Sequence, residues 1–173
     1  YHDQDLSKGQ GFKRSVSVEQ FKYNADGSIP LLIPTKEGVK QSVSNLNPFK
    51  RVEAETIAWS EGLKTAGESK TGVFVTKIDN GDYIKVRSVD FGKGAKKFEA
   101  SVASESNGGQ IEIRLDKIDG ELLGVCEVEN TGGLQNWAMQ TCKVKKTKGI
   151  HDLCFVFKGG DGQLFNFDWW QFK

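Results

Sequence analysis

The stretch "DGQLFNFDWWQFK", residues 161–173, places aromatic and polar side chains in near alternation. Successive side chains of a β-strand point to opposite faces, so the stretch predicts a strand over residues 164–172. Asn166 and Asp168 would share one face of it, and a carboxylate on so apolar a strand needs a cation or hydrogen bonds. The other side chains would divide between the two faces, with Phe165, Phe167 and Trp169 in the core and Leu164 and Trp170 beside the polar pair.

The remaining chain has the same two-residue period, with no long helical period, and Gly, Asn and Asp interrupt it in stretches such as "NADGS" and "ESNGGQ". These residues accept the positive φ of tight hairpin turns. Short strands at a spacing of about ten residues indicate an all-β fold, an antiparallel β-sandwich or barrel. The other predicted strands cover residues 14–22, 29–34, 50–56, 73–78, 82–89, 97–104, 110–116, 121–128, 138–145 and 151–157.

Composition excludes several classes of partner. The 24 Lys and Arg side chains balance 23 Asp and Glu side chains, so no broad field attracts nucleic acid or anionic lipid. The one basic cluster, "KVKKTK" at 143–148, has no aromatic residue among its lysines and is typical of a solvated strand end. No apolar run approaches the roughly 20 residues of a membrane span. We predict a monomer, and because the chain begins at Tyr1 any signal peptide would lie outside it.

The sequence divides into two predicted parts, residues 1–46 and 47–173. The first part holds one hairpin, at residues 11–35, and then the polar stretch "TKEGVKQSVSNLNP", which is typical of a linker. An isolated hairpin is marginally stable in water, so this one should pack on the following domain or on a partner. The alternative is that the hairpin extends the same sandwich as the second part.

Two of the three cysteines are symmetric about the loop "NTGGLQNW". If residues 121–128 and 138–145 pair as a hairpin centred on Leu134, Cys126 faces Cys142 at a separation that overlaps the disulfide range. The sequence therefore predicts a bridge between them. Cys154 is predicted to be a small buried hydrophobic residue rather than a nucleophile.

Three carboxylates could meet a cation. Glu53 and Glu55 lie two residues apart and so project from one side of their strand, and Asp168 needs a positive partner. Carboxylates without Cys or His suit a hard ion such as calcium. The alternative is that the two glutamates line a solvated face.

Most of the second part resembles a family 6 carbohydrate-binding module, from about Asn47 to Phe172. The resemblance implies a jelly-roll-like β-sandwich with a structural calcium held by Glu53, Glu55, Asp168 and a backbone carbonyl at Lys70 or Thr71. It rests on the stretches "RVEAETIAWSEGL", "IDNGDYIKVRSVDFGKGAKKFEASVAS", "GGQIEIRLDKIDGELLG", "ENTGGLQNW", "GIHDLCFVF" and "LFNFDWWQF", in this order.

The same resemblance implies a sugar site at the loop end of the sandwich. Modules of this family hold one pyranose between two aromatic planes beside the asparagine of the N-x-D motif, which matches Asn166. One aromatic corresponds to Trp137, whereas the position of the second is occupied by Lys77. The aliphatic stem of Lys77, Trp59 or Phe74 could replace the second plane, although a core role is the alternative for both aromatics.

The first residues, "YHDQDLSKGQGFKRSVSVEQFKYNADGSIPLLIPTKEGV", resemble the end of a family 43 glycoside hydrolase. The acid and base carboxylates of that family come from earlier blades of its propeller, which this chain lacks. Hydrolysis needs two carboxyl groups flanking the glycosidic bond, and the only such grouping here is the predicted calcium site. A working glycosidase is therefore not expected.

The sequence favours non-catalytic carbohydrate binding that targets a linked glycoside hydrolase to plant polysaccharide such as xylan or arabinoxylan. The alternative is a structural adaptor, a sandwich that has lost sugar affinity and packs against a catalytic domain. A polysaccharide substrate and the predicted disulfide both favour a secreted, periplasmic or cell-surface protein.

Overall fold

The computed structural model describes residues 19–33 and 44–173. The chain divides into two units, Tyr1–Ser44 and Asn45–Lys173. Among the described residues, no helix is long and apolar enough to cross a lipid bilayer.

The described part of the first unit is a single turn. The amide of Asn24 donates to the carbonyl of Ser28 at 2.9 Å, and the Asp26 carboxylate accepts from the Ser28 amide at 2.9 Å. No strand forms over residues 19–22 or 29–33, so this part of the predicted hairpin is wrong, and its other residues lie outside the described ranges. Apolar side chains remain in water here, with exposed fractions of 61% for Ile29, 89% for Leu31, 42% for Leu32 and 75% for Ile33.

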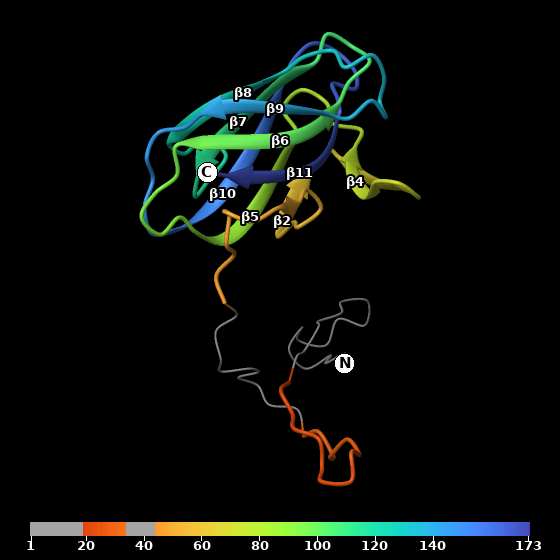
Figure 1. Cartoon of the computed structure of the whole chain (residues 1–173), viewed down its shortest axis with the longest axis vertical. Helices are drawn as coiled ribbons and strands as arrows, with labels where there is room; N and C mark the ends of the chain where they lie inside the picture. The colour runs from red at the N-terminus through yellow and green to blue at the C-terminus, as the bar shows by residue number, and fades with distance from the viewer. Residues whose placement is uncertain (1–18, 34–43) are drawn as a thin grey trace, which may run out of the picture. The chain divides into compact units, whose positions relative to one another are not determined.

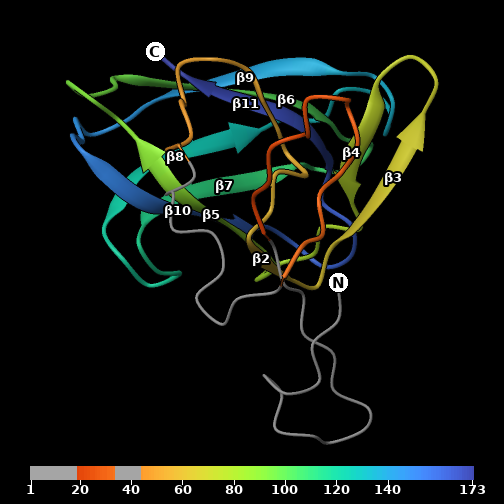
Figure 2. The ribbon, with the colours of Figure 1, turned by 90° about the horizontal axis from the view of Figure 1, so that it is seen from below.

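The second unit is an antiparallel β-sandwich, as predicted (Figure 1). One sheet has the order β3-β4-β11-β6-β9, with β1 also paired to β11, and the other has the order β2-β5-β10-β7-β8. Figure 2 shows the two sheets as stacked layers. The strands are β1 (Val52–Glu53), β2 (Trp59–Glu61), β3 (Lys64–Glu68), β4 (Gly72–Thr76), β5 (Tyr83–Asp90), β6 (Lys97–Ala103), β7 (Gly109–Leu115), β8 (Leu122–Val128), β9 (Ala138–Lys143), β10 (Ile150–Lys158) and β11 (Asn166–Phe172).

Aromatic rings join the two sheets. Phe155 of β10 lies at the centre, with its ring 5.2 Å from Trp170, 5.5 Å from Phe98 and 5.8 Å from Phe167, and all four side chains are fully buried. Tilted and edge-on aromatic pairs add about 0.5–1.5 kcal/mol each beyond the area that they bury. The alternation of β10 and β11 therefore supplies the core that the sequence predicts.

One detail of β11 differs from the prediction. The pairing with β6 shifts register between Phe167 and Trp169, which marks a bulge at Asp168. The extra residue moves Trp170 and Phe172 into the core and leaves Trp169 half-buried outside, beneath the guanidinium of Arg51 at 5.4 Å. The assignment of Trp169 to the core and of Trp170 to the polar face was therefore wrong.

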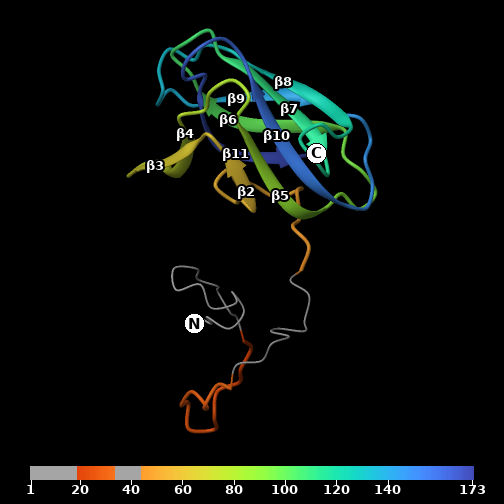
Figure 3. The ribbon, with the colours of Figure 1, turned by 180° about the vertical axis from the view of Figure 1, so that it is seen from behind.

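The chain enters and leaves the sandwich at one end. The Leu46 amide donates to Ser88 at 2.8 Å where β5 finishes, and Lys173 exchanges backbone hydrogen bonds with Lys97 where β6 begins. The loops after β4, β8 and β10 lie at the other end, because each of these strands runs away from the entry point. In Figure 3 the five-stranded sheet faces the viewer between these two ends.

The predicted hairpin of β8 and β9 does not form, because β8 pairs with β7 and β9 with β6. The two strands are instead neighbouring outer strands of different sheets. All three cysteines are free thiols, so the cross-strand geometry proposed for a bridge is wrong. Cys126 and Cys142 still meet between the sheets, and Cys154 is buried as predicted.

The two neighbouring thiols differ in acidity. The hydrogen bond from Cys126 lowers the pKa of the Cys142 thiol, while this hydrogen bond and burial raise the pKa of Cys126. Burial also raises the pKa of Cys154. Because the thiolate is the reactive form, iodoacetamide at about pH 8 should label Cys142 well before the other two cysteines, as followed by peptide mass spectrometry. Equal rates at Cys142 and Cys154 would contradict the arrangement, and Cys142→Ser should abolish the fast phase.

Candidate functional site

The predicted sugar residues lie at the loop end of the six-stranded sheet. Asn166 begins β11, and the pairing of Phe167 with Val75 places it beside the end of β4, next to Lys77. Trp137 directly precedes β9 at the same end. The structure thus brings three separate chain segments to one end of the sheet.

The Asn166 amide connects these segments. Its Nδ2 donates to the carbonyl of Leu134 at 2.7 Å, and its Oδ1 accepts from Gln163 Nε2 at 3.0 Å. Gln163 Nε2 also lies 3.3 Å from Thr76 Oγ1. An amide has two donor hydrogens and two acceptor lone pairs, so Asn166 keeps one of each for a ligand. Only 3% of Asn166 is exposed. We call the surface around Asn166, Trp137 and Lys77 the cleft, after the sugar site that the family resemblance predicts there.

Trp137 provides the one aromatic plane of the cleft. Its ring is half-buried against the edge of Phe74, with ring centres 5.2 Å apart, and its Nε1 lies 3.5 Å from Glu68 Oε1. Phe74 is 5% exposed and therefore supports Trp137 rather than facing a ligand. Trp59 lies on β2 of the other sheet, outside the cleft.

Lys77 is exposed and has a φ of 55°, the left-handed region that few residues other than glycine adopt. The cleft therefore combines one ring, one buried amide and one flexible cation. Sequence reasoning missed Glu68 and Gln163, which orient Trp137 and Asn166. Only the position of Gln163 three residues before Asn166 could have indicated either of them.

Three of the predicted metal residues, Glu53, Glu55 and Asp168, meet where β1 pairs with β11. The Ala54 amide donates to the Asp168 carbonyl at 2.8 Å, which places Glu53 and Glu55 beside the bulge. The Arg51 guanidinium binds both oxygens of Glu53 at 2.8 Å and lies 3.5 Å from Asp168 Oδ1. Two carboxylates thus contact one cation, and the charge of Glu55 acts on it as well.

Two oxygens of this pocket lack a hydrogen-bond donor, although the Arg51 guanidinium lies 3.5 Å from one of them, Asp168 Oδ1. Glu55 Oε2 and Asp168 Oδ1 are both buried and accept no hydrogen bond. Burial raises the pKa of Asp168, Arg51 opposes the shift, and Glu53 and Glu55 add to it. A hard cation would satisfy both orphan oxygens, so this donor set fits calcium.

Two observations limit that fit. Across the described ranges, no three acidic, His or Cys side chains are arranged to hold a metal ion as they stand. Lys70 and Thr71 lie in the turn between β3 and β4, where the Thr71 hydroxyl donates to Glu68 at 2.5 Å and neither residue forms a hydrogen bond with Glu53, Glu55 or Asp168. Filling the site would therefore require Arg51 to release Glu53.

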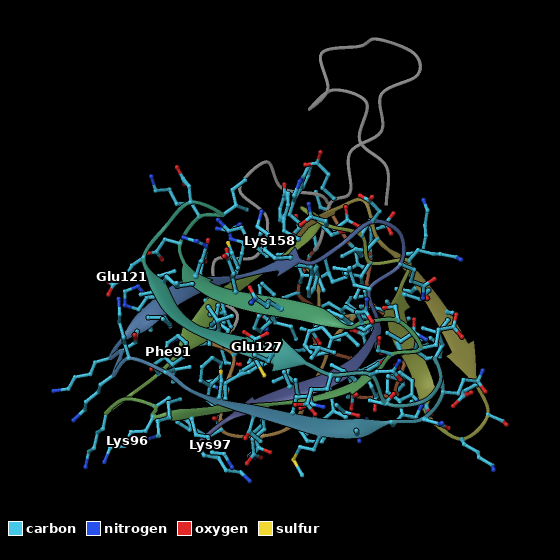
Figure 4. The ribbon with its side chains drawn as sticks, turned by 90° about the horizontal axis from the view of Figure 1, so that it is seen from above. Phe91, Lys96, Lys97, Glu121, Glu127 and Lys158 are labelled. Atoms are coloured by element: carbon cyan, nitrogen blue, oxygen red, sulfur yellow. The ribbon has the colours of Figure 1, made fainter. Side chains whose placement is uncertain are left out.

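A polar hollow of about 710 Å³ opens on the five-stranded sheet, beside the loops that follow β8 and β10. Glu127 and Lys158, labelled in Figure 4, line it together with Gln110. Gly108 belongs to its wall, with a φ of 72°, and a side chain there would collide with the carbonyl of Val128. The hollow offers hydrogen-bonding groups but no aromatic plane.

The chain matches the family model "Carbohydrate binding module (family 6)" over residues 53–173. The chain is also 46% identical, over 184 aligned positions, to an arabinoxylan arabinofuranohydrolase of Bacillus subtilis. That alignment covers 99% of this chain but 35% of the relative, so the chain spans about a third of its length.

Solved structures give the same result. A family 6 carbohydrate-binding module from Clostridium cellulolyticum, in complex with xylose, is 42% identical with a TM-score of 0.72, covering 74% of this chain and 99% of that one. A family 43 arabinoxylan arabinofuranohydrolase from Bacillus subtilis, in complex with cellotetraose, is 44% identical with a TM-score of 0.77. The second match covers 100% of this chain and 37% of that chain.

The hydrogen bonds around Asn166 predict a stability effect. Gln163→Leu should lower the free energy of unfolding by about 1–3 kcal/mol, because it leaves a buried amide oxygen without its donor. Urea denaturation measures this, with Gln135→Leu at an exposed position of the nearby loop as the control. Equal midpoints for the two variants would show that Gln163 does not support Asn166.

Proposed function

The chain belongs to the family 6 carbohydrate-binding modules, and on that premise we propose that it binds plant polysaccharide such as xylan or arabinoxylan at the cleft of Trp137 and Asn166. The carrying observation is a partly exposed indole beside a buried amide with one donor and one acceptor free. A pyranose has apolar C–H faces and a hydroxyl rim, which match a ring and an amide.

Binding at this cleft should be weak. A single stacking ring contributes about 1 kcal/mol beyond its area burial. With Lys77 in place of a second ring, an oligosaccharide should bind with a Kd of roughly 1 mM, or about −4 kcal/mol. The Lys77 side chain offers a hydrocarbon stem and a donor in place of the missing plane.

The role of such binding is to hold a catalytic domain near its substrate, by raising the effective concentration. Two observations support a linked family 43 hydrolase as the partner: the similarity to the Bacillus subtilis enzyme and the apolar side chains of Ile29–Ile33, which remain in water in the described part of the first unit. A polysaccharide substrate implies a site of action outside the cytoplasm.

A structural adaptor is the second candidate, because Gln163 and Leu134 already use one acceptor and one donor position of the Asn166 amide. In this role the sandwich packs against a catalytic domain without binding sugar.

Restoring the second aromatic separates these two functions. Lys77→Trp should tighten the binding of xylo-oligosaccharides about tenfold, or about 1.4 kcal/mol. The backbone at Lys77 is already left-handed, so another non-glycine residue adds little strain. Adding Trp137→Ala should remove the gain, because both rings would contact one sugar and are therefore coupled. Isothermal titration calorimetry measures both effects.

Trp59→Ala is the matched control, since it removes an exposed indole from the other sheet. If Lys77→Trp keeps its fold by circular dichroism and binds no sugar, the cleft is rejected and the adaptor is favoured. Binding that survives Trp137→Ala but fails on Glu127→Ala would place the sugar in the polar hollow instead.

We also propose a structural calcium at Glu53, Glu55 and Asp168. Its support is the two orphan oxygens and the excess of carboxylates over the single Arg51 guanidinium. The ion would supply the positive charge that joins β1 to the bulge of β11. Arg51 stabilises the pocket without the ion and, by releasing Glu53, would open it.

Calcium should therefore stabilise the fold after chelation. If the ion binds only the folded state, a concentration about 100 times its Kd adds about 2.7 kcal/mol and raises the melting temperature. Asp168→Asn should abolish the response, whereas Asp161→Asn, in the exposed loop after β10, should retain it. A melting curve of the unaltered protein that is the same with calcium and with chelator excludes the ion.

A further inference from the structure

The end of the sandwich opposite the cleft carries a group of lysines, which we call the basic end. Three backbone segments form it: residues 91–97, residues 143–149 and Lys173. They contribute eight lysines, all exposed: Lys93, Lys96 and Lys97 from the first segment, Lys143, Lys145, Lys146 and Lys148 from the second, and Lys173.

Backbone hydrogen bonds hold the three segments together. The Val144 amide donates to the Lys96 carbonyl at 3.0 Å, and the Lys96 amide donates to the Lys173 carbonyl at 2.7 Å. The Gly149 amide donates to the Gly92 carbonyl at 3.3 Å, which ties the far parts of the two longer segments to each other. Figure 4 shows Lys96 and Lys97 projecting outward at this end. The lysines are therefore fixed near each other and do not belong to a single flexible run.

Acidic residues balance only part of this charge. Glu99 binds Lys97 at 2.9 Å and Lys173 at 2.6 Å, and these contacts hold the pKa of Glu99 below its ordinary value. Glu121 lies 3.8 Å from Lys145. Among the described residues, the other five lysines of the basic end make no ion pair with a carboxylate. Because the whole chain has a net charge of only +1, the positive charge is concentrated here.

We infer that the basic end binds an acidic polysaccharide, one that carries carboxylates of uronic acids along its chain. Ammonium groups on flexible stems suit carboxylates at variable spacing, whereas bidentate phosphate recognition favours arginine, which these segments lack. Within the described ranges, no exposed aromatic side chain lies in the three segments, so nucleobases would find no ring to stack on. The choice of a polysaccharide among polyanions rests on the proposed function.

The test compares two variants of equal charge. Lys93→Gln/Lys96→Gln/Lys146→Gln removes three charges from the basic end, and Lys22→Gln/Lys64→Gln/Lys70→Gln removes three exposed charges outside it. At about 50 mM salt, the first variant should bind immobilised polygalacturonate about tenfold more weakly than the unaltered protein, and the second about equally. Raising the salt to about 500 mM should remove the difference, because exposed charges are then screened.

The same proteins are also tested for binding to neutral xylan and to duplex DNA. Both variants should bind neutral xylan as the unaltered protein does. If none of the three proteins binds xylan, sugar binding at the cleft is rejected, whereas the inference about the basic end still stands. Equal weakening of polygalacturonate binding by both variants would show a general charge effect and overturn the inference. The inference would also be overturned, in favour of a nucleic acid, if the protein bound DNA more tightly than polygalacturonate and only the first variant lost that binding.

Discussion

Strand β11 forms backbone hydrogen bonds with three other strands, and one extra residue at Asp168 divides it into two halves. Before the bulge, Phe167 faces the core and Asn166 reaches the cleft; after it, Trp170 and Phe172 face the core. Without the extra residue, the second half would turn its indole outward and lose the contact of Trp170 with Phe155. The bulge thus lets a single strand serve the core, the cleft and the acidic pocket.

The cleft and the acidic pocket illustrate two ways of burying polar groups. Asn166 shares its hydrogen bonds with Gln163 and the Leu134 carbonyl, so its burial fixes two loops. Asp168 and Glu55 each keep an oxygen without a donor, and such a group costs about 1–3 kcal/mol. In the first arrangement both polar atoms of the side chain have a hydrogen bond and one donor and one acceptor remain, whereas in the second two buried oxygens have none. This difference explains why the two sites need different experiments.

The sequence predicted the positions of β4 to β11 because each is a run of β-forming residues bounded by turn residues. It missed β2 and β3, whose sequences WSE and KTAGE are exposed edge strands without a buried alternation. The bulge was also missed, because adjacent Trp169 and Trp170 allow either indole to be assigned to the core. The loop after β8 resembles a hairpin turn in composition, yet its residues carry the chain from one sheet to the other. Trp137, Asn166 and Lys77 were predicted through a family resemblance, whereas Glu68 and Gln163 act through contacts that depend on the folded chain.

The position of the chain ends has a practical meaning for modular construction. Leu46 and Lys173 both lie at the end of the sandwich away from Trp137 and Asn166, because β5 and β11 run from the cleft toward the point where the chain enters. A domain fused at either point is attached on the side remote from the loops. The sandwich can therefore be moved between host proteins, or repeated in tandem, with the loops around Trp137 and Asn166 left open to solvent.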